Sequence, residues 1–199
     1  MQLPTVPEHH RGRRWPTTRW IARTVLHASG WKVEGEVPDH PRLILVVGPH
    51  TSNWDFVYGM MAILATNLDI HWLGKNSLFK PPVTGVMSWL GGIPVNRANP
   101  KGVVEDIADK FRQADSLSVI ITPEDTRSRV ERIKTGFLRI AESADCGLLI
   151  TTLDFSSKTI RLGETLKRST DMEADLERIL QLFSEVTPRN PDNFSGPEN

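Results

Sequence analysis

The chain has 199 residues, and its 24 basic and 24 acidic side chains give a formal net charge of zero at pH 7. This length fits one domain with a substantial buried core, and the charge balance excludes bulk attraction to nucleic acid as the function. A single cysteine, Cys146, excludes a disulfide within the chain and fits a reducing compartment, so we interpret the protein as cytoplasmic. We find neither the run of about 20 apolar residues that a bilayer-spanning helix needs nor a secretory signal at the N-terminus.

The composition changes at both ends of the chain. Residues 1–17 are polar, with prolines and basic side chains, and predict a flexible leader. Residues 187–199 are rich in proline and asparagine and predict a surface tail. Between them, residues 18–186 show neither a repeat nor a linker, so we expect them to form one domain.

Short apolar runs alternate along the chain with segments of helical spacing. The clearest run, residues 43–47, ends at Gly48-Pro49 and predicts a buried strand. Apolar residues spaced i, i+3, i+4 and i+7 start at Val104 and again at Leu176, and predict helices. This alternation predicts the α/β class: a single layered domain with a mostly parallel central sheet flanked by helices. Further strands are expected at 117–121 and 148–153, weaker ones at 70–73, 93–95 and 159–162, and further helices near 54–66 and 134–143.

A basic amphipathic helix is predicted over residues 18–30. Trp20, Ile21, Val25 and Leu26 lie on one apolar side of it. The N-terminal end of this segment is crowded with arginines, namely Arg11, Arg13, Arg14, Arg19 and Arg23. A helix of this kind can lie in a lipid headgroup layer, which would place the protein peripherally on the inner face of the membrane. The alternative is that the helix packs on the domain while its arginines face water, and the sequence leaves both open.

A histidine and an aspartate five residues apart follow the strongest predicted strand. His50 stands where the strand ends and the chain turns, which in open α/β sheets is the edge where ligands bind. Ser52 or Asn53 can cap the next helix, so Asp55 falls in its first turn. Within one continuous helix two such side chains would point apart, but the carboxylate can reach a histidine in the turn before the helix. We therefore expect His50 and Asp55 to be neighbours.

Such a pair has a definite chemical use. A neutral imidazole can accept a proton from a hydroxyl near pH 7, and a carboxylate on its other nitrogen fixes the tautomer and stabilises the imidazolium that forms. A substrate hydroxyl activated in this way attacks directly, so a protein nucleophile is not needed, and the sequence contains no G-x-S-x-G motif. Taken alone, however, this spacing is better explained by a capping aspartate beside a turn histidine.

Three sequence blocks resemble those of the glycerolipid acyltransferase family, whose best-known members are the 1-acylglycerol-3-phosphate acyltransferases. Residues 50–55, HTSNWD, are similar to the first block, N-H-x-S-x-x-D, with Pro49 in the place of the usual asparagine. Residues 92–97, GIPVNR, resemble the second block, an apolar strand that ends in arginine. Residues 123–128, PEDTRS, resemble the third block, P-E-G-T-R-S. The order and the gaps agree, and the resemblance covers about residues 18–186.

This resemblance implies a fold like that of glycerol-3-phosphate acyltransferase, and an activity. A fatty acyl group would move from an acyl thioester, on coenzyme A or acyl carrier protein, to the hydroxyl of a lysophospholipid-like acceptor. His50 would be the general base and Asp55 its orienting partner, with no metal or other cofactor beyond the thioester co-substrate. The implied substrate-binding residues are Arg97 and Arg127, which would hold the acceptor's phosphate, with Thr126 in the same block. Glu124 would position the acceptor or brace Arg127, and Lys75 would lie near the developing oxyanion.

Two positions depart from the family pattern. Asp125 stands where the third block has glycine, and a carboxylate beside a phosphate site would repel the phosphate. Residues 150–153, where the fourth block usually has Val-Pro, lack the proline. We therefore expect an acceptor other than ordinary lysophosphatidate, or one that carries its anion elsewhere.

Two alternatives to acyl transfer stay open. A relative that has lost catalysis could carry lipid without converting it, and Asp125 favours this alternative. A hydrolase could use His50 to activate water and cleave the thioester. Lipid that co-purifies without thioester consumption would favour the first, and free fatty acid released without an acceptor would favour the second.

Overall fold

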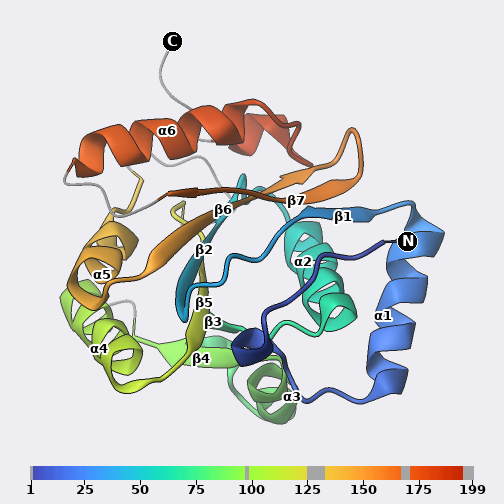
Figure 1. The fold of residues 1–199 in the computed structure, drawn as a ribbon, viewed down its shortest axis with the longest axis horizontal. Coiled ribbons are helices and arrows are strands. Elements are labelled where there is room, and N and C mark those ends of the chain that lie inside the picture. Colours follow the sequence, from blue (N-terminus) through green and yellow to red (C-terminus); the bar gives the residue numbers. More distant parts are fainter. Residues whose placement is uncertain (1, 97–98, 125–132, 167–170, 195–199) are drawn as a thin grey trace.

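A seven-stranded sheet forms the centre of the computed structural model, which describes residues 2–96, 99–124, 133–166 and 171–194 (Figure 1). In chain order its strands are β1 (Lys32–Gly35), β2 (Arg42–Gly48), β3 (His71–Lys75), β4 (Gly92–Val95), β5 (Leu117–Ile121), β6 (Gly147–Asp154) and β7 (Thr159–Leu166). They lie in the order β1-β7-β6-β2-β5-β3-β4. Strands β6, β2, β5, β3 and β4 are mutually parallel. Strand β7 pairs antiparallel with β6, and β1 pairs parallel with β7.

Helices cover both faces of this sheet, which confirms the predicted α/β class (Figure 1). One face is covered by α1 (Pro16–Ser29), α2 (Asn53–Thr66) and α3 (Thr84–Trp89), and the other by α4 (Pro100–Gln113), α5 (Gly136–Ala144) and α6 (Met172–Ser184). Short 3₁₀ turns are η1 (Glu8–His10), η2 (Asn76–Leu78) and η3 (Pro191–Asn193). The sequence does not predict strand β1, in which one of four side chains is buried, or helix α3, whose six residues are too short to show a period.

Strand β2 is covered on both faces, which explains its unbroken apolar run. Ile44 and Val46 are fully buried against α4, α5 and α6. Leu43 and Leu45 point the other way and are buried against α2. Successive side chains of a strand alternate between faces, so a strand covered on both sides needs apolar residues at every position.

Helix α1 both packs on the domain and keeps an apolar outer face. Ala22 and Leu26 are buried against α2, and Arg23 Nε donates a hydrogen bond to the Ala65 carbonyl at the end of α2 (3.2 Å). Trp20 nevertheless keeps 67% of its surface exposed, and Ile21 is exposed beside it. The packing that the sequence left open is therefore present, and the apolar side predicted for this helix is divided between core and surface. Among the described helices none is long and apolar enough to cross a membrane.

Two side chains anchor the segment that the sequence marks as a flexible leader. Val6 and His10 are buried. His10 Nε2 donates to the His40 carbonyl oxygen (2.8 Å), which leaves Nδ1 to accept from the Ser118 hydroxyl (2.9 Å). The imidazole therefore links the N-terminal segment to the amino ends of β2 and β5.

The buried position of His10 predicts a pH-dependent stability. Burial lowers its pKa from the ordinary value of 6.5, although the hydrogen bond to His40 acts in the opposite direction. The unfolded chain then binds a proton at a higher pH than the folded chain, so the free energy of unfolding falls as the pH drops through the ordinary pKa. We expect urea unfolding at about pH 7.5 and 5.5 to show a larger loss of stability in the wild type than in His10→Asn. Equal losses in the two proteins would contradict this role for His10.

Candidate active site

His50 lies in the turn that joins β2 to α2. Gly48, the last residue of β2, packs against the ring of Phe183 from α6, and a Cβ atom there would overlap that ring. The turn leaves the sheet at the carboxyl edge of its parallel strands, as the sequence predicts. His50 keeps 19% of its side chain exposed, so a substrate can reach the imidazole.

Asp55, in the first turn of α2, reaches back to His50. Its Oδ2 atom lies 3.2 Å from Nδ1 of the imidazole. Unlike His50, Asp55 is almost fully buried, so water does not compete for its carboxylate. The structure thus brings together the two side chains that the spacing predicts to be neighbours.

The Asp55 carboxylate also closes the N-terminus of α2. Oδ2 accepts hydrogen bonds from the main-chain N–H groups of Thr51 and Ser52, both at 2.7 Å, and Oδ1 accepts from the Ser52 hydroxyl at 2.8 Å. Ser52 in turn caps the helix by accepting from the Trp54 N–H (3.2 Å), which completes a capping box. Burial by itself would raise the pKa of Asp55, but the hydrogen bonds from His50 and Ser52 outweigh it and hold the pKa below the ordinary 3.8. The carboxylate is therefore ionised at neutral pH.

Glu124 holds the main chain of His50 from the other side. Its carboxylate Oε2 accepts a hydrogen bond from the His50 N–H at 2.6 Å, and its side chain is buried. Glu124 follows β5, the direct neighbour of β2 in the sheet. Sequence reasoning places Glu124 near the acceptor or near Arg127, and this contact with the histidine backbone is additional.

A cavity of about 1370 Å³ opens beside His50. Its lining includes four basic side chains, Lys75, Lys101, Lys134 and Arg139, and two acidic ones, Asp55 and Glu105. Its walls are mainly apolar and come from the strands on both sides of β2 and from α2, α4 and α5; Leu45 and Met60 line the part beneath α2. The histidine therefore stands at the mouth of a space that suits a long apolar chain.

Three predicted substrate-binding residues lie outside the described residues. They are Arg97, Thr126 and Arg127, and Asp125 lies outside them as well. Lys75 is described and exposed at the rim of the cavity. The assignments of Arg97, Thr126 and Arg127 to the acceptor and of Lys75 to the oxyanion therefore stay predictions.

The C-terminal segment binds the turn between His50 and Asp55, which sequence reasoning misses. Asn190 donates from its main-chain N–H to the Thr51 hydroxyl (3.2 Å) and from its side-chain amide to the Thr51 carbonyl (3.0 Å). Asn193 adds a longer bond to the same carbonyl, at 3.4 Å. Thr51 is fully buried as a result. The asparagines repeated in the tail are the sequence signal for this contact, but the sequence does not indicate which residue they bind.

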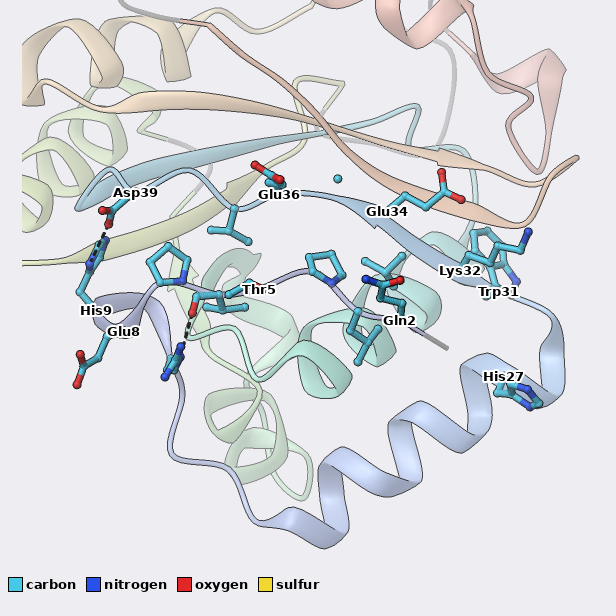
Figure 2. A pocket seen from close by; sticks show the side chains of 18 of the residues that line it. Gln2, Thr5, Glu8, His9, His27, Trp31, Lys32, Glu34, Glu36 and Asp39 are labelled. Atoms are coloured by element: carbon cyan, nitrogen blue, oxygen red, sulfur yellow. Dashed lines mark hydrogen bonds and ion pairs between the residues drawn. The ribbon is translucent and has the colours of Figure 1, made fainter.

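A second groove, of about 1290 Å³, lies between residues 2–9 and β1 (Figure 2). The ring nitrogen Nδ1 of His9 lies 3.6 Å from a carboxylate oxygen of Asp39 across it. The lining of this groove includes neither His50 nor Asp55. Its acidic side chains are Glu8, Glu34, Glu36 and Asp39.

Other reactive groups give no competing site among the described residues. Cys146 is buried, and burial raises the pKa of its thiol to about 12, so it stays protonated and unreactive at neutral pH. Within the described ranges no group of three or more histidine, cysteine or acidic side chains is placed to hold a metal ion.

These features define an α/β protein with a histidine–carboxylate pair at the mouth of an apolar cavity. A family model described as "Acyltransferase" matches residues 31–154, so the chain belongs to the acyltransferase family. This match confirms the family resemblance read from the sequence blocks. No curated protein gives a significant match. Among solved structures the fold is similar to the 1-acyl-sn-glycerophosphate (LPA) acyltransferase PlsC from Thermotoga maritima, with 18% sequence identity and a TM-score of 0.64 over 85% of this chain and 76% of that chain.

The bond between the C-terminal segment and Thr51 predicts a stability effect. Asn190→Ala leaves the buried Thr51 carbonyl without its shorter partner, so we expect the free energy of unfolding to fall by about 1–2 kcal/mol. Asn193→Ala removes only the longer bond and should cost clearly less. Urea unfolding of both variants measures the difference, and an equal effect of the two substitutions would argue against the proposed anchoring by Asn190.

Proposed function

We propose that the protein transfers a fatty acyl group from an acyl thioester, on coenzyme A or acyl carrier protein, to the hydroxyl of a lysophospholipid-like acceptor. The observation that carries this proposal is the 3.2 Å approach of Asp55 to His50 Nδ1 at the mouth of the apolar cavity. Membership of the acyltransferase family supports acyl transfer. The acceptor class is supported by the similar fold of an enzyme whose name states that it acts on lysophosphatidate.

In this mechanism His50 acts as the general base. Asp55 is ionised and holds the proton on Nδ1, so Nε2 presents its lone pair to the acceptor hydroxyl. Nε2 takes the hydroxyl proton while the oxygen attacks the thioester carbonyl and forms the new ester bond. The carbon–sulfur bond then breaks, and the thiolate leaves and receives the proton from the imidazolium. Asp55 stabilises the imidazolium between these two steps.

Basic side chains line the cavity and suit the negative charges of the thioester carrier and the lysophospholipid-like acceptor. Lys75 is proposed to lie near the oxyanion that develops on the thioester carbonyl. The hydrogen bond from the His50 N–H to Glu124 supports a role for Glu124 in positioning the base. Arg97, Thr126 and Arg127 are proposed, on the family resemblance alone, to bind the phosphate of the acceptor.

The cavity is large enough for a lipid chain. Its volume of about 1370 Å³ exceeds the roughly 300–1,000 Å³ of ordinary small-molecule pockets. Its apolar walls favour the acyl chain over water, which also protects the thioester from hydrolysis.

We also propose that the protein works at a membrane surface, because its substrates are lipids. The outer side of α1 presents Trp20, Ile21 and Val25, which are all exposed. Arginines surround this helix, with Arg19 and Arg23 on it and others just before it. A basic amphipathic helix with exposed aromatic side chains suits the inner, anionic face of a membrane.

The central test is an assay with labelled acyl-CoA and acyl carrier protein against a panel of lysolipids that includes lysophosphatidate. We expect one acceptor class to become acylated by the wild type. His50→Ala should lower turnover about a thousandfold, because the general base is lost, with an unchanged melting temperature. Substantial turnover by His50→Ala would end the proposal. Free fatty acid released without acceptor would instead identify a hydrolase, and bound lipid without thioester consumption a non-catalytic carrier.

A second prediction separates the two roles of Asp55. Asp55→Asn should cost about 10²–10⁴-fold in turnover because the imidazole tautomer is lost. Ser52→Ala removes the helix cap but keeps the contact between His50 and Asp55, so it should cost about 1 kcal/mol of stability with most of the turnover retained. Steady-state kinetics and urea unfolding of both variants check this. If the two variants lost turnover in parallel with stability, Asp55 would act only as a cap.

A further inference from the structure

A buried threonine lines the apolar part of the cavity beneath α2. Thr151 belongs to β6, and only 4% of its surface is exposed. Its hydroxyl group has no hydrogen-bond partner within the part of the chain that the structure describes. A buried hydroxyl group without a partner costs stability, and such groups are rare in folded proteins. The position of Thr151 therefore needs a physical explanation.

The sheet directs the Thr151 side chain towards α2. Side chains of a strand alternate between its two faces, and Leu149 and Leu153, two positions away on either side, are buried on the face that α1 and α2 cover. The Cα partners of Thr151 in the adjoining strands are Val47 of β2 and Leu162 of β7, and both line the cavity. Thr151 therefore places a hydroxyl group in an otherwise apolar stretch of the wall.

Another threonine of the same cavity has a satisfied hydroxyl group. Thr66, in the last turn of α2, lines the cavity as well, but its hydroxyl donates to the Ala62 carbonyl oxygen at 2.8 Å. A hydroxyl group that is bonded within its own helix does not need a ligand. Thr151 differs because its hydroxyl keeps one donor and two acceptor positions for another group.

This hydroxyl group stands where the chain departs from its family. Residues 150–153 occupy the fourth sequence block and lack the usual proline. Valine has nearly the shape of threonine and is equally favoured in strands, so the hydroxyl group is what distinguishes the two residues. An apolar wall needs no hydroxyl group, and packing alone does not explain Thr151.

A water molecule is a poor partner for this hydroxyl group. Buried water is held by several polar groups at once, and the side chains of Val47 and Leu162 beside Thr151 offer none. A ligand that is itself apolar, except for one hydroxyl group, matches these surroundings better. Rotation about χ1 by roughly 120° exchanges the hydroxyl and methyl positions of threonine, so the hydroxyl can turn to such a ligand without movement of the main chain.

Thr151 lies well below His50 in the cavity. Its partner Val47 precedes His50 by three positions in the sequence, which is roughly 10 Å along a strand. An acyl chain whose thioester carbonyl lies beside His50 would therefore pass Thr151 near its middle, and not at its head.

We propose that Thr151 selects acyl donors that carry a hydroxyl group near the middle of the chain, and that this group forms the hydrogen bond that the threonine lacks. The inference rests on the proposed acyl transfer and names the donor class, a hydroxylated fatty acyl thioester. A plain chain would fill the same space but leave the Thr151 hydroxyl unpaired. A site built to bond a substrate hydroxyl discriminates strongly against the analogue without it.

The preference is measured as the turnover of a 10-hydroxystearoyl thioester relative to a stearoyl thioester. Thr151→Val removes the hydroxyl group at nearly constant shape and should lower this ratio about tenfold. Thr151→Ser keeps the hydroxyl group and should hold the ratio within about threefold of wild type. Thr152→Val makes the same change at the next position of β6, whose side chain points to the other face and does not line the cavity. It should leave the ratio unchanged.

Stability distinguishes a ligand contact from a structural one. Because the Thr151 hydroxyl has no partner among the residues described, Thr151→Val should leave the melting temperature of the ligand-free protein unchanged or raise it. A clearly lower melting temperature would show that the hydroxyl group serves the fold and would overturn the proposal. Equal turnover ratios in Thr151→Val and the wild type, or an equal loss in Thr152→Val, would overturn it too.

The position of the substrate hydroxyl is tested with a 3-hydroxystearoyl thioester. Its hydroxyl group lies close to the thioester and so far from Thr151. We expect Thr151→Val to leave the turnover of this donor, relative to the stearoyl donor, within about twofold of wild type. A loss as large as that of the 10-hydroxystearoyl donor would contradict a contact in the middle of the chain.

Binding of the free acids separates failure of this inference from failure of the proposed function. 10-Hydroxystearic acid and stearic acid are titrated into the wild type and into Thr151→Val, without thioester or acceptor. A protein that transfers no acyl group, but binds the hydroxy acid about tenfold more tightly when Thr151 is present, disproves the transfer and keeps the contact. Turnover of the stearoyl donor, without preference for the hydroxylated chain in turnover or in binding, disproves the contact alone.

Discussion

The carboxylate of Asp55 both begins helix α2 and contacts His50. Its oxygens accept the N–H groups of Thr51 and Ser52 and so begin α2, and the same Oδ2 atom reaches the imidazole. The direction of the helix and the orientation of the histidine are therefore coupled. Four hydrogen-bonding groups converge on a buried carboxylate, which keeps it ionised although burial opposes the charge. The contacts of Asp55 thus hold the His50 imidazole in place.

Distant parts of the chain support this turn from both sides. Glu124 holds the His50 N–H from the end of the neighbouring strand, 74 residues away. Asn190 holds Thr51 from the C-terminal segment, 139 residues away. A short turn between a strand and a helix would otherwise have several conformations. The sheet and the C-terminal segment both hold it, so the geometry of the His50–Asp55 pair depends on contacts from distant parts of the fold.

The two faces of the sheet differ in the apolar side chains that their helices leave exposed. Helices α4, α5 and α6 enclose a large core with Phe111 and Phe183 fully buried. Helices α1, α2 and α3 cover a core on the other face but leave large apolar side chains outside. Buried apolar side chains therefore lie on both faces of the sheet, whereas the large exposed ones lie mainly on the face of α1, α2 and α3.

The sequence by itself determined the α/β class, the position of most strands and helices, and the proximity of His50 and Asp55. These follow from local rules: periodicity, the end of an apolar run, and a capping position one turn into a helix. The family was also readable, because its motif blocks are local in sequence. Only the tertiary structure decided that Glu124 and Asn190 hold the turn, and that Leu26 is buried while Trp20 is exposed. Those are contacts between segments far apart in the chain, and no local pattern specifies which segment meets which.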